Sequence, residues 1–243
     1  MLLEASSVEK WYLRGKGFSN RFFAVNSTDL ILESGKVTVL TGRSGSGKTT
    51  LMNMMAGLLT PDGGKVLLDG KDLYAMDDNT LSRLRNRHFG MIPQGAEILP
   101  DLTVMENILL PIGIYRDRSG RSASEAEECA RELLEQMEIG NLSDVPAKEL
   151  SGGERRRVCA ARALAGAPEF VFADEPTSDL DDDNTKIILS VLRQATASGC
   201  AVMIVTHDPE ALGYADIHYR MDGGSLSVLP EDNKPKEEKI HAI

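Results

Sequence analysis

Cysteine is scarce in this sequence of 243 residues, which contains three: Cys129, Cys159 and Cys200. An odd number of scattered cysteines does not build a disulfide framework, and their spacing is not that of metal ligands. We interpret them as reduced thiols of a cytosolic protein, with small side chains that are buried or partly buried.

Long apolar runs are also absent. No stretch approaches the roughly 18 consecutive apolar residues that a membrane span needs. The first ten residues, MLLEASSVEK, have neither a basic start nor an apolar core, so no signal peptide is predicted. We expect a soluble protein that, if it works at a membrane, does so from outside the bilayer.

Positive charge is in deficit, with 27 Lys and Arg against 37 Asp and Glu and a net charge of −10. This balance argues against a protein whose affinity for nucleic acid comes from phosphate contacts, although it leaves room for a local basic patch. The hydrophobic share of 42% is enough for a buried core. We therefore expect a folded protein with no nucleic-acid partner.

Three apolar runs dominate what is present: KVTVLTG (36–42), EFVFADE (169–175) and CAVMIVTHD (200–208). Continuous runs of this length predict buried strands of a parallel sheet. All three end in polar residues, and ligands of such sheets bind beyond the carboxyl ends of the strands. The remaining elements predicted are helices at 49–59, 80–88 and 122–139, a short strand at 65–70, and a disordered tail at 230–243.

The segment GRSGSGKT (42–49) matches the phosphate-binding pattern G-x-x-x-x-G-K-[ST] between a predicted strand and a predicted helix. Its glycines let successive N–H groups point inward toward an anion, and the helix N-terminus adds its dipole. Lys48 is expected to reach the terminal phosphates, and the Thr49 hydroxyl to bind Mg²⁺. The nucleotide-binding residues predicted here are Gly42, Ser44, Gly45, Ser46, Gly47, Lys48, Thr49 and Thr50.

Polar residues at the ends of the other two runs predict the rest of the site. Asp174 can hold Mg²⁺ through water, and Glu175 can polarise the water that attacks the γ-phosphate. His207 could bond the γ-phosphate or orient that water. The structural alternatives are a surface glutamate and a histidine without a chemical role.

A second glycine turn, LSGGE at 150–154, is more than one nucleotide obviously needs. With it, the chain resembles the ATP-binding subunit of ABC transporters over about residues 5–228, with the motifs in the order of that family. The resemblance identifies GRSGSGKT as Walker A, FVFADE as Walker B, LSGGE as the signature and SDLD (178–181) as the D-loop. It also assigns nucleotide-contacting roles to Gln94 (Q-loop, catalysis and metal), Asp181 (D-loop), His207 (switch histidine) and Tyr12 (adenine stacking, with Trp11 adjacent).

The resemblance implies an α/β fold: a P-loop NTPase with a mostly parallel central sheet, an antiparallel β subdomain and an inserted helical subdomain. The ATPase domain is expected at 1–229, with its core at about 1–80 and 166–229 and the helical subdomain at about 81–165.

The resemblance also implies that two subunits pack head to tail around two ATP. Ser151 can cap a helix that begins near Glu154, while Gly152 and Gly153 expose N–H groups to the nucleotide of the second subunit. An ordinary Ser-capped helix start is the structural alternative.

A subgroup is suggested by LRNRHFGMIPQ (84–94) and ILPDLTVMENILLP (98–111). They are similar to lipoprotein-releasing and macrolide-exporting ATPases and to the cell-division ATPase of that group, which serve four-span permeases from the cytoplasmic face of the membrane. The stretch from Gln94 to Pro111 is where the family contacts its membrane partner, although plain helix packing would also explain its apolar residues.

Two other functions compete with a transporter subunit. A non-transport ABC ATPase with a regulatory or signalling role is the first, but the short interval between Lys48 and Ser151 leaves no room for the long coiled coil of the chromosome-organising members. The second is another P-loop enzyme such as a kinase or GTPase. It lacks a guanine-specific motif here and would not explain LSGGE.

Overall fold

The computed structural model describes residues 1–13, 21–114 and 123–229. The tail predicted at 230–243 lies outside the described residues. In the described part of the chain, no helix is long and apolar enough to cross a membrane.

The centre of the molecule is a six-stranded sheet in the order β10-β9-β3-β8-β7-β6. The strands are β3 (Val37–Gly42), β6 (Phe89–Ile92), β7 (Phe170–Asp174), β8 (Ala201–Val205), β9 (Ile217–Asp222) and β10 (Ser225–Val228). All neighbours are parallel except β9 and β10. The three apolar runs of the sequence are β3, β7 and β8, which lie side by side, so their prediction as buried parallel strands is confirmed.

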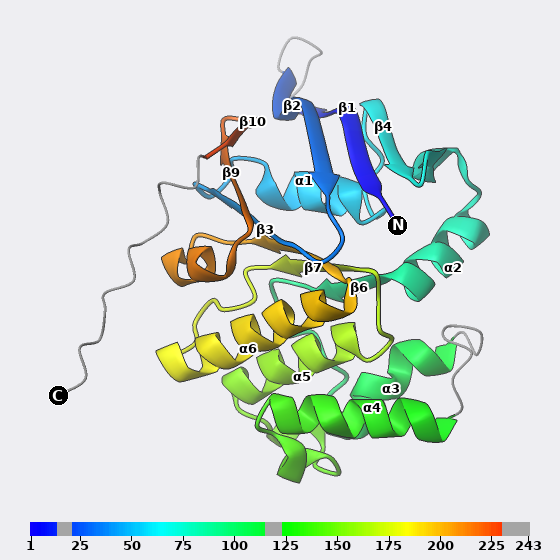
Figure 1. Cartoon of the computed structure of the whole chain (residues 1–243), viewed down its shortest axis with the longest axis vertical. Coiled ribbons are helices and arrows are strands. Elements are labelled where there is room, and N and C mark those ends of the chain that lie inside the picture. The colour runs from blue at the N-terminus through cyan, green and yellow to red at the C-terminus, as the bar shows by residue number, and fades with distance from the viewer. Residues whose placement is uncertain (14–20, 115–122, 230–243) are drawn as a thin grey trace, which may run out of the picture.

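Both faces of this sheet are covered. Every residue of β7 and β8 is buried, and successive residues alternate between two hydrophobic cores. Val171 and Ala173 belong to the core shared with the helices below the sheet in Figure 1, whereas Phe170 and Phe172 belong to the core above it. A period of two residues along a strand produces this division.

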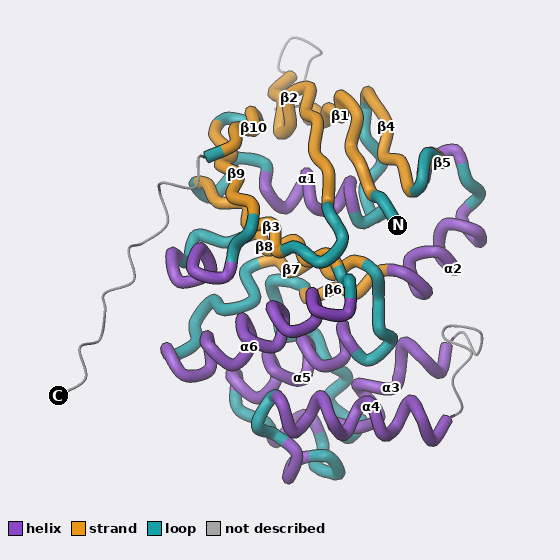
Figure 2. Tube along the Cα trace, in the orientation of Figure 1, coloured by secondary structure: helices purple, strands orange, loops and turns teal. Residues whose placement is uncertain are grey.

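A second sheet, in the order β2-β1-β4-β5, is antiparallel throughout. Its strands are β1 (Leu3–Leu13), β2 (Arg21–Leu32), β4 (Gly63–Leu68) and β5 (Lys71–Asp72). Figure 2 shows helix α1 between this sheet and the central one. The antiparallel β subdomain expected from the family resemblance is therefore present, and β4 is the short strand predicted at 65–70.

Six α-helices complete the described part of the chain: α1 (Lys48–Met55), α2 (Asp78–His88), α3 (Val104–Ile114), α4 (Ala123–Gln136), α5 (Gly152–Leu164) and α6 (Asp182–Ala195). Short 3-10 turns lie at Leu73–Ala75, Gly140–Leu142, Ala147–Glu149, Thr196–Ser198 and Pro209–Tyr214. Helices α3 to α6 gather on one side of the central sheet (Figure 1).

The region expected to be the helical subdomain, 81–165, contains α3, α4 and α5 but also β6, which pairs with β7 in the central sheet. Helix α1 ends at Met55 rather than at residue 59, because Gly57 adopts a left-handed conformation (φ 69°) that turns the chain. Helix α5 begins at Gly152, two residues before the expected start.

Candidate nucleotide-binding site

The phosphate loop joins the end of β3 to the start of α1, and two of its glycines cannot be replaced by a residue with a side chain. A Cβ atom at Gly47 would lie 1.9 Å from the Ala24 carbonyl oxygen, and one at Gly42 would lie 2.2 Å from that of Met221. Gly47 also has a left-handed φ of 106°. The loop is thus held against β2 and β9 at distances that only glycine permits.

Lys48 is buried, with 7% of its surface exposed, although it carries a charge. Its Nζ atom donates to the carbonyl oxygens of Gly42 at 2.8 Å and Arg43 at 3.2 Å. The ammonium group is therefore folded back over the loop, which places a positive charge where a phosphate would be enclosed.

Thr49 and Asp174 meet across the gap between α1 and β7. The Thr49 hydroxyl donates to Oδ2 of Asp174 at 2.9 Å, while Oδ1 of Asp174 is buried without a hydrogen-bond partner in the described part of the chain. Burial raises the pKa of the Asp174 carboxyl, and the nearby Glu175 charge acts in the same direction. A buried carboxylate oxygen without a donor, beside a hydroxyl, fits a hard cation such as Mg²⁺.

Glu175 follows β7 with a left-handed backbone (φ 48°) that is stabilised by its N–H bond to the Val205 carbonyl at 2.7 Å. Its Oε2 atom accepts from the Thr206 hydroxyl at 3.0 Å and from the His207 N–H at 3.3 Å. Nδ1 of His207 lies 2.9 Å from the same oxygen. The Glu175 carboxylate is thus oriented by Thr206 and His207, which follow β8.

These groups line one cavity of about 580 Å³ at the carboxyl ends of β3, β7 and β8. From the predicted site residues it brings together Tyr12, Gly42, Ser44, Gly45, Gly47, Lys48, Thr49, Thr50, Gln94, Asp174, Glu175 and His207. Ser46 is buried within the loop but is not part of the lining, and its hydroxyl has no partner in the described part of the chain.

Sequence reasoning missed Phe22, Ala24 and Arg43, which also line this cavity. Phe22 is opposite Tyr12 in the pairing of β1 and β2, and their ring centroids are 5.8 Å apart. Two aromatic rings therefore stand at the entrance to the phosphate loop. Trp11 is not in the lining, and its ring lies 4.1 Å from the Arg21 guanidinium instead.

The signature residues lie outside this cavity. Ser151 caps α5 through reciprocal bonds with Glu154, because its hydroxyl accepts from Glu154 N–H at 3.3 Å and its own N–H donates to Glu154 Oε2 at 2.7 Å. The Ser151 hydroxyl also donates to Glu154 Oε2 at 2.7 Å, and this bond, followed by the one from the Ser151 N–H, lowers the pKa of the Glu154 carboxyl. The predicted cap is confirmed, and Ser151 and Gly152 remain exposed.

Asp181 caps α6, and its carboxylate accepts from the Asn184 N–H at 2.8 Å. A Cβ atom at Gly153 would lie 3.5 Å from the Asn184 amide nitrogen, so the first turns of α5 and α6 are neighbours. Ser151, Gly152, Gly153 and Asp181 therefore lie near one another and away from the chain's own phosphate loop.

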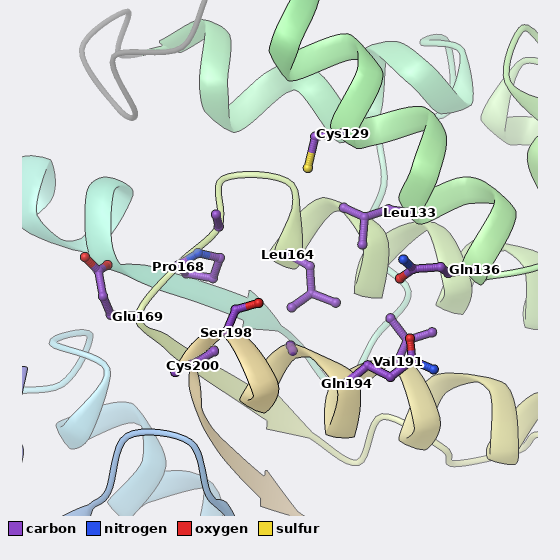
Figure 3. A pocket seen from close by; sticks show the side chains of 13 residues that line it. Cys129, Leu133, Gln136, Leu164, Pro168, Glu169, Val191, Gln194, Ser198 and Cys200 are labelled. Atoms are coloured by element: carbon purple, nitrogen blue, oxygen red, sulfur yellow. The ribbon is translucent and has the colours of Figure 1, made fainter.

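Another cavity, of about 430 Å³, lies at the opposite edge of the sheet, where β7 and β8 begin (Figure 3). Its described lining includes Gln136, Gln194 and Glu169, together with the thiols of Cys129 and Cys200, but no lysine or arginine. Burial raises the pKa of the Cys200 thiol to about 12, so this thiol is not reactive at neutral pH. A polyphosphate would find no positive charge among these described residues, so this cavity does not suit a nucleotide.

Comparisons with known proteins agree with this geometry. Residues 25–178 match the sequence profile of the ABC transporter family. The lipoprotein-releasing system ATP-binding protein LolD of Shewanella oneidensis is 38% identical over 230 residues, which is 94% of this chain and 96% of that protein. The macrolide export ATP-binding/permease protein MacB 2 of Aeromonas hydrophila is 35% identical over 215 residues, covering 88% of this chain and 32% of that larger protein.

Among solved structures, the ATP-binding cassette MJ0796, in a dimeric post-hydrolysis state bound to ADP and Pi, superposes with a TM-score of 0.83. It is 29% identical, and the match covers 94% of this chain and 99% of that one. The profile spans more than half of the chain and the fold agrees over nearly all of it. This chain belongs to the ABC transporter family and has its ATP-binding, ATP-hydrolysing fold.

Proposed function

We propose that this chain is the ATPase subunit of a transporter of the lipoprotein-releasing or macrolide-exporting kind, working as a pair around two ATP on the cytoplasmic face of a membrane. The observation that carries this proposal is the single cavity that combines the phosphate loop, the Thr49–Asp174 pair and the Glu175–His207 pair. Each part serves a different step of ATP hydrolysis.

Binding is assigned to the phosphate loop. Its N–H groups and the N-terminus of α1 receive the phosphates, and Lys48 exchanges its loop carbonyls for phosphate oxygens. Thr49 and Asp174 would hold Mg²⁺, which neutralises charge on the phosphates when bound. Tyr12 is assigned to the adenine ring, and Phe22 packs beside it.

Hydrolysis is assigned to Glu175, which accepts a proton from the attacking water, and to His207, which orients that water or the γ-phosphate. The two hydrogen bonds to Oε2, from the Thr206 hydroxyl and the His207 N–H, hold the carboxylate beside Nδ1 of His207 in the cavity. Gln94 follows β6 at the edge of the same cavity, where its side-chain oxygen can reach the cation or the water.

A second subunit completes the site in this proposal. Ser151, Gly152 and Gly153 form the N-terminus of α5, where Ser151 and Gly152 are exposed and Glu154 is the acid of the first turn. Such a terminus favours negative charge. The ATP bound to the partner's phosphate loop supplies that charge. Asp181 lies beside this terminus and is assigned to the same subunit interface.

The permease is assigned to a cavity of about 460 Å³ between α1, α2, β6 and α3. Leu58 and Ile114, two large exposed apolar side chains, lie on its rim with Pro111 and Arg162. Pro111 places this cavity at one end of the stretch from Gln94 to Pro111 that the family resemblance assigns to the membrane partner. We propose a permease with four membrane spans as the partner.

The test is to recover tagged Glu175→Gln protein from native membranes with Mg-ATP and identify what accompanies it, with Lys48→Ala as the matched control. A four-span permease captured by the first variant and not by the second would support the proposal. A six-span channel would move the chain to another transporter class. A cytosolic partner alone would favour the non-transport alternative.

A further inference from the structure

Arg156 lies inside the molecule, on α5, with 7% of its surface exposed. A buried guanidinium loses the solvation of its charge and of its N–H donors, so it is tolerated only where oxygens replace the water. Five residues earlier on the chain stands Ser151, the exposed cap of the same helix. Arg156 thus places a charge deep behind the signature turn.

The partners of Arg156 come from two loops, the one after β6 that holds Gln94 and the one between β7 and α6 that holds Glu175 and Ser178. Nη1 donates to the Gln94 carbonyl oxygen and makes a longer contact, of 3.5 Å, with that of Glu175. Nη2 donates to both oxygens of Ser178, the carbonyl at 3.3 Å and the hydroxyl at 2.9 Å. All four acceptors are neutral, so the side chain serves these loops as a hydrogen-bonding bracket.

This bracket joins the main chain at the positions proposed to act on the γ-phosphate. One nitrogen serves both Gln94 and Glu175, and the fork of the guanidinium sets its distance from the second nitrogen at Ser178. A lysine ammonium has no rigid fork and cannot reproduce that spacing. The relative position of the two loops therefore depends on the shape of Arg156 and not only on its charge.

We propose that Arg156 is a positioning residue for hydrolysis, which fixes the loop of Gln94 against the turn that runs from Glu175 to Ser178 at the start of the D-loop. The inference rests on the functions proposed above for Gln94 and Glu175. Arg156 makes none of the bonds of the phosphate loop, so it sets the rate of turnover without setting the affinity for ATP.

The test compares Arg156→Met and Arg156→Lys with the matched control Arg155→Met, using the purified full chain. Arg155 is the neighbouring residue on α5, and its Nη2 donates to the Lys148 carbonyl at 3.0 Å, outside these loops. Turnover is measured per nucleotide site, titrated with a fluorescent ATP analogue. We expect kcat to fall roughly tenfold to a hundredfold in both Arg156 variants, since small displacements of catalytic groups cost that much.

In both Arg156 variants, KM for ATP and the melting temperature should stay near the wild-type values. In the control Arg155→Met, kcat, KM and the melting temperature should all stay near the wild-type values. Ser178→Ala should lower kcat less than the Arg156 variants do, because it removes only the bond between Nη2 and the Ser178 hydroxyl. That bond is already lost in Arg156→Met, so Ser178→Ala should have no further effect in that variant.

A wild-type kcat in Arg156→Lys would overturn the inference. So would a loss of kcat that only follows a loss of folded protein, or a rise in KM without a change in kcat. If the wild-type chain hydrolyses no ATP, the proposed function fails instead, so the two failures are distinguishable.

Discussion

His207 and Glu175 lie 2.9 Å apart, Nδ1 to Oε2, yet the histidine side chain is 73% exposed and the glutamate side chain 11%. The pair thus joins the inside of the nucleotide cavity to the outer surface. Because the same carboxylate oxygen also accepts from Thr206, its orientation is fixed before any nucleotide arrives. This arrangement leads to the first prediction.

Glu175→Gln should retain ATP binding and lose turnover. The amide keeps the size of the side chain and can accept from Thr206, but it cannot take a proton from water. A general base typically contributes about 10²- to 10⁴-fold, so phosphate release should fall at least a hundredfold while the affinity for ATP changes little. Hydrolysis near the wild-type rate, with the membrane partner present, would show that Glu175 is not the base.

Lys48→Ala should weaken nucleotide binding. The buried ammonium group makes charge-assisted bonds worth roughly 1.5–3 kcal/mol each, so one lost phosphate bond should raise the Kd for ATP at least tenfold. Equilibrium titration with a fluorescent nucleotide measures this. Lys71→Ala, a change at an exposed residue of β5, is the control and should bind normally. Unchanged affinity in Lys48→Ala would exclude the proposed phosphate contact.

Ser151→Arg should leave ATP binding by the single subunit intact and block ATP-driven pairing, because a long side chain would fill the exposed turn. Ser151→Ala separates this effect from loss of the helix cap, which should cost about 1 kcal/mol of stability. Sedimentation of both variants in a Glu175→Gln background gives the readout. Normal dimers of Ser151→Arg with ATP would contradict the cross-subunit assignment.

His218 should make the fold less stable in mild acid. Its Nε2 lies 2.8 Å from the Thr41 hydroxyl, and burial lowers its pKa below the ordinary 6.5. Below pH 6.5 the unfolded chain therefore binds the extra proton more readily than the folded one, so the free energy of unfolding falls as pH falls. Urea unfolding at pH 7.5 and 5.5 should show a larger loss in the wild type than in His218→Gln. Equal losses would assign the pH dependence to other groups.

The strands at the site were predictable because they are buried on both faces, which makes β3, β7 and β8 continuous apolar runs. The strands of the antiparallel sheet were less predictable from the sequence. In β1, the register with β2 shifts between Ala5 and Val8, and Ser7 has a left-handed φ of 48°. These irregularities interrupt the alternation of apolar residues, so the strand has no clear period in the sequence.

Contacts between distant residues were also beyond the sequence. Phe22 reaches the nucleotide cavity only because β1 and β2 pair in the register that sets it opposite Tyr12. Arg156 stands between two other arginines, Arg155 and Arg157, with nothing local to distinguish it. Its burial and its partners in two loops arise from the packing of α5 under the sheet, which no motif encodes.

Successive side chains of β7 point into two different hydrophobic cores, so the two cores can be repacked separately. Phe172 packs with α1, the helix of the phosphate loop, whereas Val171 packs with the side that holds α3 and α4. A change of volume in one core needs compensation only from residues of that core, because close packing transmits strain to direct neighbours. A change of side-chain volume among α3, α4 and their contacts should thus leave the packing around α1 unchanged.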